Sequence, residues 1–196
     1  MRKLLFALAL LVFASCTEKT PEIIKKERIN VYEVTDTFGE LKKKETPSMV
    51  IVRECNQGGN ITKLGFYNGE SGEVLFGQTF VYNEQGIAVR CSKQATNGIF
   101  SITEDIYKED GRWFKNEDGK TTLLGEDYHI ADCVYTDFVQ CDENGICIFI
   151  MPSVIGGECA GEIIKKDKTG KWIEFSIITQ DVGTPQMILE RELEMW

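Results

Sequence analysis

The stretch that decides the fold runs from residue 141 to residue 150 and reads CDENGICIFI. A polar segment at 142–144 leads through Gly145 to a run of apolar, β-forming residues at 147–150. Polar turn residues that end in glycine, next to apolar runs, are typical of β-hairpins. Glycine suits the end of such a loop because it adopts the left-handed backbone conformation without steric cost. We therefore expect a hairpin whose loop ends at Gly145.

The same arrangement recurs along the chain. Polar stretches end in glycine at 82–86 (YNEQG), 107–111 (YKEDG) and 166–170 (KDKTG), with looser versions at 67–72 and 114–119. Residues that favour strands flank them, such as LGFY at 64–67, TFVY at 79–82 and WIEF at 172–175. Repeated hairpins predict an all-β fold, with about eight to ten antiparallel strands in a meander barrel or sandwich.

The loop type predicts the register of each hairpin. In a three-residue loop that ends in left-handed glycine, the residue four positions before the glycine lies opposite the residue two positions after it. The predicted pairs are Tyr82 with Ala88, Tyr107 with Trp113, Cys141 with Cys147, and Lys166 with Trp172.

The pairing of Cys141 with Cys147 also predicts a disulfide. In this register the two residues form a non-hydrogen-bonded pair, in which Cα atoms lie about 4.5 Å apart. That separation is within the range that a disulfide accepts. The alternative is a two-residue turn at Asn144 and Gly145, which would place the cysteines diagonally and weaken the case.

The tyrosine, the acidic or amide residue and the following glycine in these segments resemble the YD-type repeats of bacterial surface and Rhs-like proteins. The glycines at 72, 86, 111, 145 and 170 do not keep one period, as a solenoid would require. Common hairpin chemistry explains the same residues, and we prefer that explanation.

The first 15 residues have the features of a secretory signal. Arg2 and Lys3 precede an apolar run at 4–13, and small residues lead to Cys16. The apolar run is too short and wrongly flanked for a membrane-spanning helix. We therefore assign residues 1–15 to a signal peptide.

The end of this signal, VFASC at 12–16, resembles the lipobox of bacterial lipoproteins. The resemblance covers only the first 16 residues, and it implies that Cys16 receives a diacylglycerol before the signal is cut. Phe13 departs from the usual leucine. Residue 17, directly after the cysteine, is threonine and not aspartate. By resemblance to Gram-negative lipoproteins, this favours the outer membrane over the inner one. The alternative is an ordinary signal peptide whose cysteine joins a disulfide.

The remaining chain divides into a tether and a domain. Residues 16–30, the lipidated N-terminus and tether, mix charges without a sustained apolar face, although a short helix starting near Ile23 is an alternative. Alternation from Val31 onward predicts a single β domain over residues 31–196. Residues 186–196 fit either a helical face or a terminal strand, and the β context favours the strand.

Composition excludes several classes of protein. A hydrophobic content of 42% and an aromatic content of 10% argue against a disordered chain. The net charge is −9, and it becomes −11 when Arg2 and Lys3 leave with the signal. This acidity argues against a nucleic-acid partner.

The cysteines indicate an exported protein but not a metal site. Six cysteines besides Cys16 are compatible with disulfides in any of 15 connectivities, and some of them are equally well explained as small buried residues. No Cys-x-x-Cys motif occurs and His129 is the only histidine. We therefore expect neither a metal ion nor another cofactor.

No catalytic site is predicted. His129 stands alone as a base, and nothing places a nucleophile such as Cys133 or Cys159 beside it. Carboxylates are abundant, but the separation that defines a glycosidase pair cannot be derived from their number. We expect a protein without enzymatic activity.

Aromatic residues beside the turns give the positive indication of binding. Tyr107, Trp113 and Trp172 are the candidates, because aromatics dominate recognition surfaces, and the alternative is that they fill the core. We expect a lipid-anchored envelope protein that binds an unidentified protein or glycan or has a structural role. The alternatives are a secreted hydrolase that uses two carboxylates on glycan or peptide, and an inhibitor or immunity protein.

Overall fold

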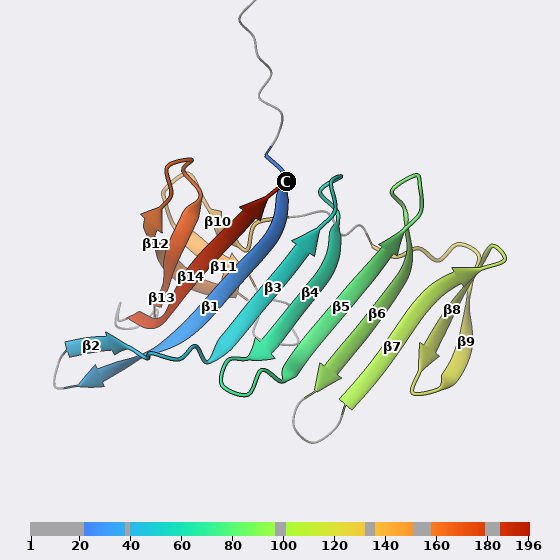
Figure 1. Cartoon of the computed structure of the whole chain (residues 1–196), viewed down its shortest axis with the longest axis horizontal. Helices are drawn as coiled ribbons and strands as arrows, with labels where there is room; N and C mark the ends of the chain where they lie inside the picture. The colour runs from blue at the N-terminus through green and yellow to red at the C-terminus, as the bar shows by residue number, and fades with distance from the viewer. Residues whose placement is uncertain (1–21, 38–39, 97–100, 132–135, 151–157, 179–184) are drawn as a thin grey trace, which may run out of the picture.

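The computed structural model describes residues 22–37, 40–96, 101–131, 136–150, 158–178 and 185–196. These residues form fourteen β-strands, which join in one antiparallel sheet (Figure 1). Within these ranges, no helix is long and apolar enough to cross a membrane. The prediction of an all-β, antiparallel fold is confirmed.

The sheet consists of two meanders that meet at the two terminal strands. Strands β3 to β9 follow one another on one side of β1, and β10 to β14 do so on the other side, with β14 paired to β1 and β2 attached to β1 alone. The bounds are β1 Ile24–Thr37, β2 Glu40–Lys43, β3 Met49–Cys55, β4 Ile61–Asn68, β5 Val74–Tyr82, β6 Ala88–Thr96, β7 Ser101–Glu109, β8 Arg112–Glu117, β9 Lys120–Gly125, β10 Val139–Cys141, β11 Cys147–Ile150, β12 Glu158–Lys166, β13 Trp172–Ile178 and β14 Pro185–Met195.

The sheet is open, whereas the sequence predicted a barrel or sandwich of eight to ten strands. Its two end strands, β9 and β10, do not pair with each other. Figure 1 shows β12 beside β13 and the more distant β10 and β11 behind β13 and β14, while β3 to β9 form a flatter wing. Register shifts at Ile163 and Lys165 in the β12–β13 pair add the local twist that favours such a curl.

The core lies where the sheet curls over itself. Alternation along the strands places Ile29, Ile51 and Phe66 on the side that also carries Phe149 and Phe175, and all five side chains are fully buried. Each buried side chain of this size contributes about 1.5–3 kcal/mol of hydrophobic stabilisation. We call this side of the sheet the core face and the opposite side the outer face.

The first strand begins earlier than the sequence predicted. Residues 24–30, expected in the tether, form the first half of β1, which pairs with β14 on one side and β3 on the other. The alternation was hidden because a charged residue, Glu27, occupies a core-face position between Lys26 and Arg28. The expected strand at residues 186–196 is β14, and it is confirmed.

Three of the four predicted hairpin registers are confirmed, and a side chain explains each loop. Tyr82 pairs with Ala88, Cys141 with Cys147, and Lys166 with Trp172. In each loop, the side-chain oxygen of an Asn or Asp three positions before the glycine accepts hydrogen bonds from two backbone N–H groups. The distances from nitrogen to oxygen are 2.8–3.1 Å. The loops are headed by Asn83, Asp142 and Asp167.

The fourth hairpin has a shorter loop than predicted. Tyr107 pairs with Phe114, and Lys108 rather than Tyr107 pairs with Trp113. The loop contains only Asp110 and Gly111, which have φ values of 47° and 80°. Positive φ at both central residues defines the two-residue turn that Asp-Gly favours in hairpins. No Asn or Asp stands three positions before this glycine to hold the longer loop.

The predicted disulfide between Cys141 and Cys147 is confirmed. Its two Cα atoms lie 4.0 Å apart, and the bond joins the first residue of β11 to the last residue of β10. The hairpin loop is therefore closed both by the glycine turn and by a covalent bond. Among the other cysteines that the structure describes, Cys55, Cys91 and Cys159 are free thiols.

A buried ion cluster joins both meanders to β1. Glu27, Arg53 and Arg191 are 1%, 3% and 5% exposed. Arg191 Nε lies 2.7 Å from Glu27 Oε1, and Arg53 Nη2 lies 2.5 Å from Glu27 Oε2. The cluster also holds the chain before β10, because Arg53 donates to the Thr136 carbonyl (2.7 Å) and Arg191 lies 3.1 Å from the Asp137 carboxylate.

We expect Glu27→Gln to destabilise the fold by about 3–5 kcal/mol, because it leaves two buried guanidinium groups without their shared carboxylate. The matched control is Glu54→Gln, which breaks an ion pair with Lys26 at the surface. That change should cost less than about 1 kcal/mol. Urea unfolding followed by tryptophan fluorescence measures both. Equal losses in the two variants would contradict a central role for the buried cluster.

Candidate functional site

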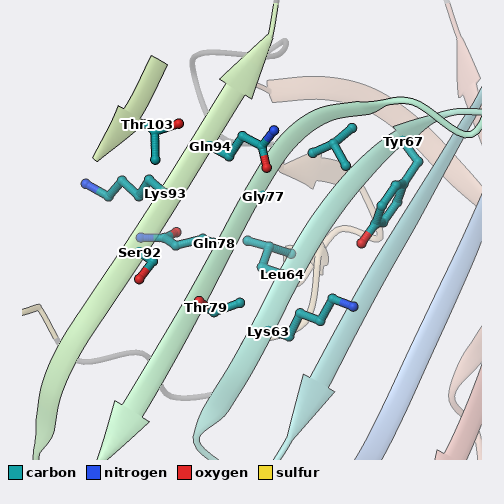
Figure 2. A pocket seen from close by; sticks show the side chains of 11 residues that line it. Lys63, Leu64, Tyr67, Gly77, Gln78, Thr79, Ser92, Lys93, Gln94 and Thr103 are labelled. Carbon is teal, nitrogen blue, oxygen red and sulfur yellow. The ribbon is translucent and has the colours of Figure 1, made fainter. Parts of the chain in front are cut away.

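The outer face of the flatter wing contains an open hollow of about 320 Å³ between β4 and β7. Figure 2 shows the side chains around it, which come from neighbouring strands of the meander. Cross-strand pairing places Lys63 beside Thr79 and Thr79 beside Ser92 on this face. The site is thus built on sheet backbone whose register is fixed by long antiparallel ladders.

Two glycines create the hollow. Gly65 in β4 and Gly77 in β5 lie directly opposite each other, so neither strand places a side chain at this point of the outer face. The Tyr67 ring covers Gly65, since a Cβ added there would lie 2.6 Å from the ring. Above Gly77 the space stays open, because a Cβ there would meet only Val74 Cγ1, at 3.4 Å.

The lining combines one aromatic ring with several hydrogen-bonding groups. Figure 2 shows Tyr67 on one side of the Gly77 strand and Gln94 and Thr103 on the other. Among the described residues, the Lys63 ammonium and the Gln94 amide make no ion pair or hydrogen bond. Within the described part of the chain, their donors and acceptors are therefore not engaged. The complete lining is Lys63, Leu64, Tyr67, Val74, Gly77, Gln78, Thr79, Ser92, Lys93, Gln94 and Thr103.

An aromatic pair lies on the same face, toward the end strands of the wing. The rings of Tyr107 and Phe114 stack with their centroids 5.6 Å apart and an angle of 24° between their planes. Cross-strand pairing continues this row to Arg90 and Val81 on one side and to Leu123 on the other. The half-exposed aromatic pair thus extends the binding surface beyond the hollow.

Asp105 and Glu104 are neighbours in β7, on opposite faces of the sheet, and both form ion pairs. The Arg90 guanidinium hydrogen-bonds Asp105 through Nε at 2.9 Å and lowers the pKa of that carboxyl, to which Ser92 Oγ also donates at 2.8 Å. On the core face, partial burial opposes ionisation of Glu104, but hydrogen bonds from Lys115 and Lys93 outweigh it and lower its pKa. Both carboxylates are therefore ionised and engaged at neutral pH.

Of the three aromatics that the sequence singled out, only Tyr107 lies on the outer face. Trp113 is 3% exposed and Trp172 is 4% exposed, and both belong to the buried interior. The two-residue loop at Asp110 explains the first case, because a one-residue shift of register turns Trp113 to the opposite face. Trp172 donates from Nε1 to Asp137 at 2.8 Å, beside the buried ion cluster.

The sequence did not predict the hollow. Tyr67 and Gln94 carry no motif, and the relevant signal is the pair of glycines at 65 and 77. These glycines fall inside β-forming runs rather than in turns, and glycine within a strand often marks a place where another molecule approaches closely. Recognising the pair requires the β4–β5 register, which places the two glycines side by side.

The other residues considered for chemistry are not brought together. His129 is exposed outside any strand, and Cys133 lies outside the described residues. Burial raises the pKa of the Cys55 and Cys91 thiols, which disfavours the reactive thiolate. No group of three or more His, Cys, Asp or Glu side chains suited to a metal ion occurs in the ranges that the structure describes.

Comparisons of the chain with protein-family models, with curated proteins and with solved structures gave no match.

We expect Arg90→Gln to raise the pKa of Asp105 toward the ordinary value of about 3.9, because it removes the hydrogen bond that lowers it. In the wild type this depressed pKa contributes stability that is fully present above about pH 4. The contribution is lost as the pH falls through the folded pKa. Carboxyl ¹³C NMR titration measures the shift.

Asp142 is the internal control for that titration, because hydrogen bonds within its own loop, led by the Ile146 backbone N–H, lower its pKa. Its midpoint should be the same in the wild type and in Arg90→Gln. An Asp105 midpoint that does not move would show that Arg90 does not set it.

Proposed function

We propose that this protein is a lipid-anchored envelope protein whose outer-face hollow binds a glycan without cleaving it. The observation that carries the proposal is the open hollow over Gly77, which has Tyr67 at one side and is also lined by hydroxyl, amide and ammonium groups. Its volume of about 320 Å³ lies at the lower end of the range of about 300–1,000 Å³ typical of small-molecule sites.

The chemistry of the lining supports a sugar as the ligand. A sugar ring presents C–H groups that pack against an aromatic face, and hydroxyls that both donate and accept hydrogen bonds. Tyr67 supplies the face, while Gln94 supplies donors and an acceptor and Thr79 and Thr103 supply hydroxyls. The stacked pair of Tyr107 and Phe114 offers a second aromatic surface for a longer chain.

The electrostatics support binding over hydrolysis. A glycosidase needs a carboxylic acid whose pKa is raised so that it can protonate the leaving group. Asp105 lies on the same face as the hollow, opposite Ser92 of its lining, and the hydrogen bond from Arg90 lowers its pKa. This arrangement favours stable ion pairs rather than proton transfer.

The proposed anchor is the lipid on Cys16, and the proposed location is the outer membrane of a Gram-negative envelope. The support comes from the residues before and after Cys16, which resemble a lipobox, and from the acidity of the mature chain. A net charge of −11 opposes attraction to anionic lipids, so a covalent lipid is needed to hold the protein at a membrane.

The anchor predicts that Cys16→Ala releases the protein from the membrane fraction. The wild-type chain should sediment with membranes, and its intact mass should show acyl chains on Cys16. Cys159→Ala is the matched control, because it removes a half-buried free thiol without touching the anchor. Sedimentation of Cys16→Ala with membranes, or an unmodified Cys16 in extracted protein, would refute the anchor.

The hollow predicts that Gly77→Val abolishes glycan binding while the fold is retained. A valine there fills the open space and suits a strand, and the only contact near its Cβ is Val74. The full-length chain is applied to an array of bacterial envelope oligosaccharides, and the strongest ligand is then titrated. We expect at least a tenfold loss of affinity for Gly77→Val and a smaller loss for Tyr67→Ala.

Thr121→Val is the control, since it also places a valine on the outer face, at exposed β9 and away from the hollow. It should bind as the wild type does. Equal binding by Gly77→Val and the wild type would refute the site. The absence of any oligosaccharide ligand, together with capture of a protein by the same face, would refute a glycan as the ligand.

A further inference from the structure

One end of the sheet gathers most of the connections that the sequence singled out. β1 begins and β14 ends there, beside the mark C in Figure 1, and we call it the tether end. Neighbouring strands are antiparallel, so the loops after β3, β5, β7, β10 and β12 all lie at this same end. The loops that end at Gly86, Gly111, Gly145 and Gly170 are among them.

Large apolar side chains are exposed at the tether end. Ile87 is 61% exposed and Ile146 is 64% exposed, and each directly follows the glycine of its loop. Trp196, which follows β14, is 55% exposed. Of the seven large hydrophobic residues that the described structure exposes, six lie in the half of the sheet toward this end; they are Val81, Ile87, Leu123, Ile146, Ile164 and Trp196.

Trp196 is held in place although it is exposed. Its backbone N–H donates to the Ile23 carbonyl at 3.1 Å, and its indole N–H donates to the Cys55 carbonyl at 3.3 Å. The Lys25 ammonium lies 5.5 Å from the ring centroid. Trp196, Lys25 and Lys26 border a hollow of about 530 Å³, together with Glu194 and Glu54, which pair with the two lysines. An exposed tryptophan is a side chain that prefers the interface between membrane and water.

The length of the chain before β1 brings this end close to the anchor. Glu22, the first residue that the structure describes, is six positions after Cys16. Six residues span at most about 20 Å even when fully extended. If Cys16 carries lipid, the tether end is therefore the part of the domain nearest to the bilayer, and its exposed apolar side chains are within reach of it.

We propose that the tether end lies against the membrane surface, with Ile87, Ile146 and Trp196 in the lipid interface. This inference rests on the proposed anchor at Cys16. Lipid chains and exposed apolar side chains cooperate in such binding, because each adds buried apolar area. The loops also carry acidic residues such as Glu84 and Glu143, so the favoured surface is zwitterionic rather than anionic.

The test uses the fluorescence of Trp196. The chain has three tryptophans, and the other two, Trp113 and Trp172, are buried. The lipidated mature protein is reconstituted in vesicles of phosphatidylcholine whose acyl chains carry bromine, a quencher of tryptophan emission at short range. We expect the Trp196 emission to be quenched at least twofold. Trp196→Phe should remove the quenched component, which identifies its source.

The variant Ile87→Ser with Ile146→Ser should lower the quenching by half or more and still sediment with the vesicles. The control is Leu41→Ser, which removes an exposed leucine from β2 at the opposite end and should leave the quenching unchanged. Replacing a third of the lipid with phosphatidylglycerol should weaken the quenching in the wild type.

The outcomes separate the anchor from the docking. Failure of the wild-type chain to sediment with vesicles would overturn the anchor and the docking with it. Sedimentation without quenching of Trp196 would overturn the docking alone. Equal quenching in the isoleucine double variant and the wild type would also overturn the proposed contact, because those side chains would then not reach the lipid.

Discussion

The carboxylate of Glu27 is the point on which the rest of the sheet depends. Because it is buried, it requires cations, and Arg53 and Arg191 supply them from β3 and β14, on opposite sides of β1. The two guanidinium groups also lie over aromatic rings, at 4.1 Å from the centroid of Phe138 and 4.5 Å from that of Trp172. The charge is therefore satisfied only when both meanders have assembled around β1, and the cluster makes the long-range order of the sheet specific.

The two wings of the sheet differ in what they contain, and the outer face of the flatter wing is available for recognition. The curled wing contains most of the core, and its residues 136–138 are tied to the ion cluster through Thr136 and Asp137. Strands β4 to β7 instead expose their outer face, where paired glycines open the hollow beside Tyr67. The side chains that line it come from regular strands, so a ligand would meet a surface that is already ordered and would lose little affinity to ordering it.

The turns and the disulfide could be predicted from the sequence, because they depend on residues close together in the chain. Features that depend on pairing between distant strands could not. The loops headed by Asn83, Asp142 and Asp167 follow directly from a side chain that caps its own turn, and the disulfide followed from the register of one of them. The Asp110-Gly111 loop has two residues where three were predicted. This difference of one residue places Trp113 on the opposite face of the sheet. The early start of β1, the open sheet and the glycine pair depend on contacts between distant segments, for which one strand's pattern carries no signal.

An open sheet has two edges, and the length of the strands at these edges affects whether copies of the protein aggregate at high concentration. The end strands among those described are β10, with three residues, and β9, with six. The disulfide restrains the short strand at one edge, while Lys120 and Gly125 bound the strand at the other. Short edge strands are poor templates for strand addition. A sheet of this size can therefore remain free of edge-to-edge aggregation without closing into a ring.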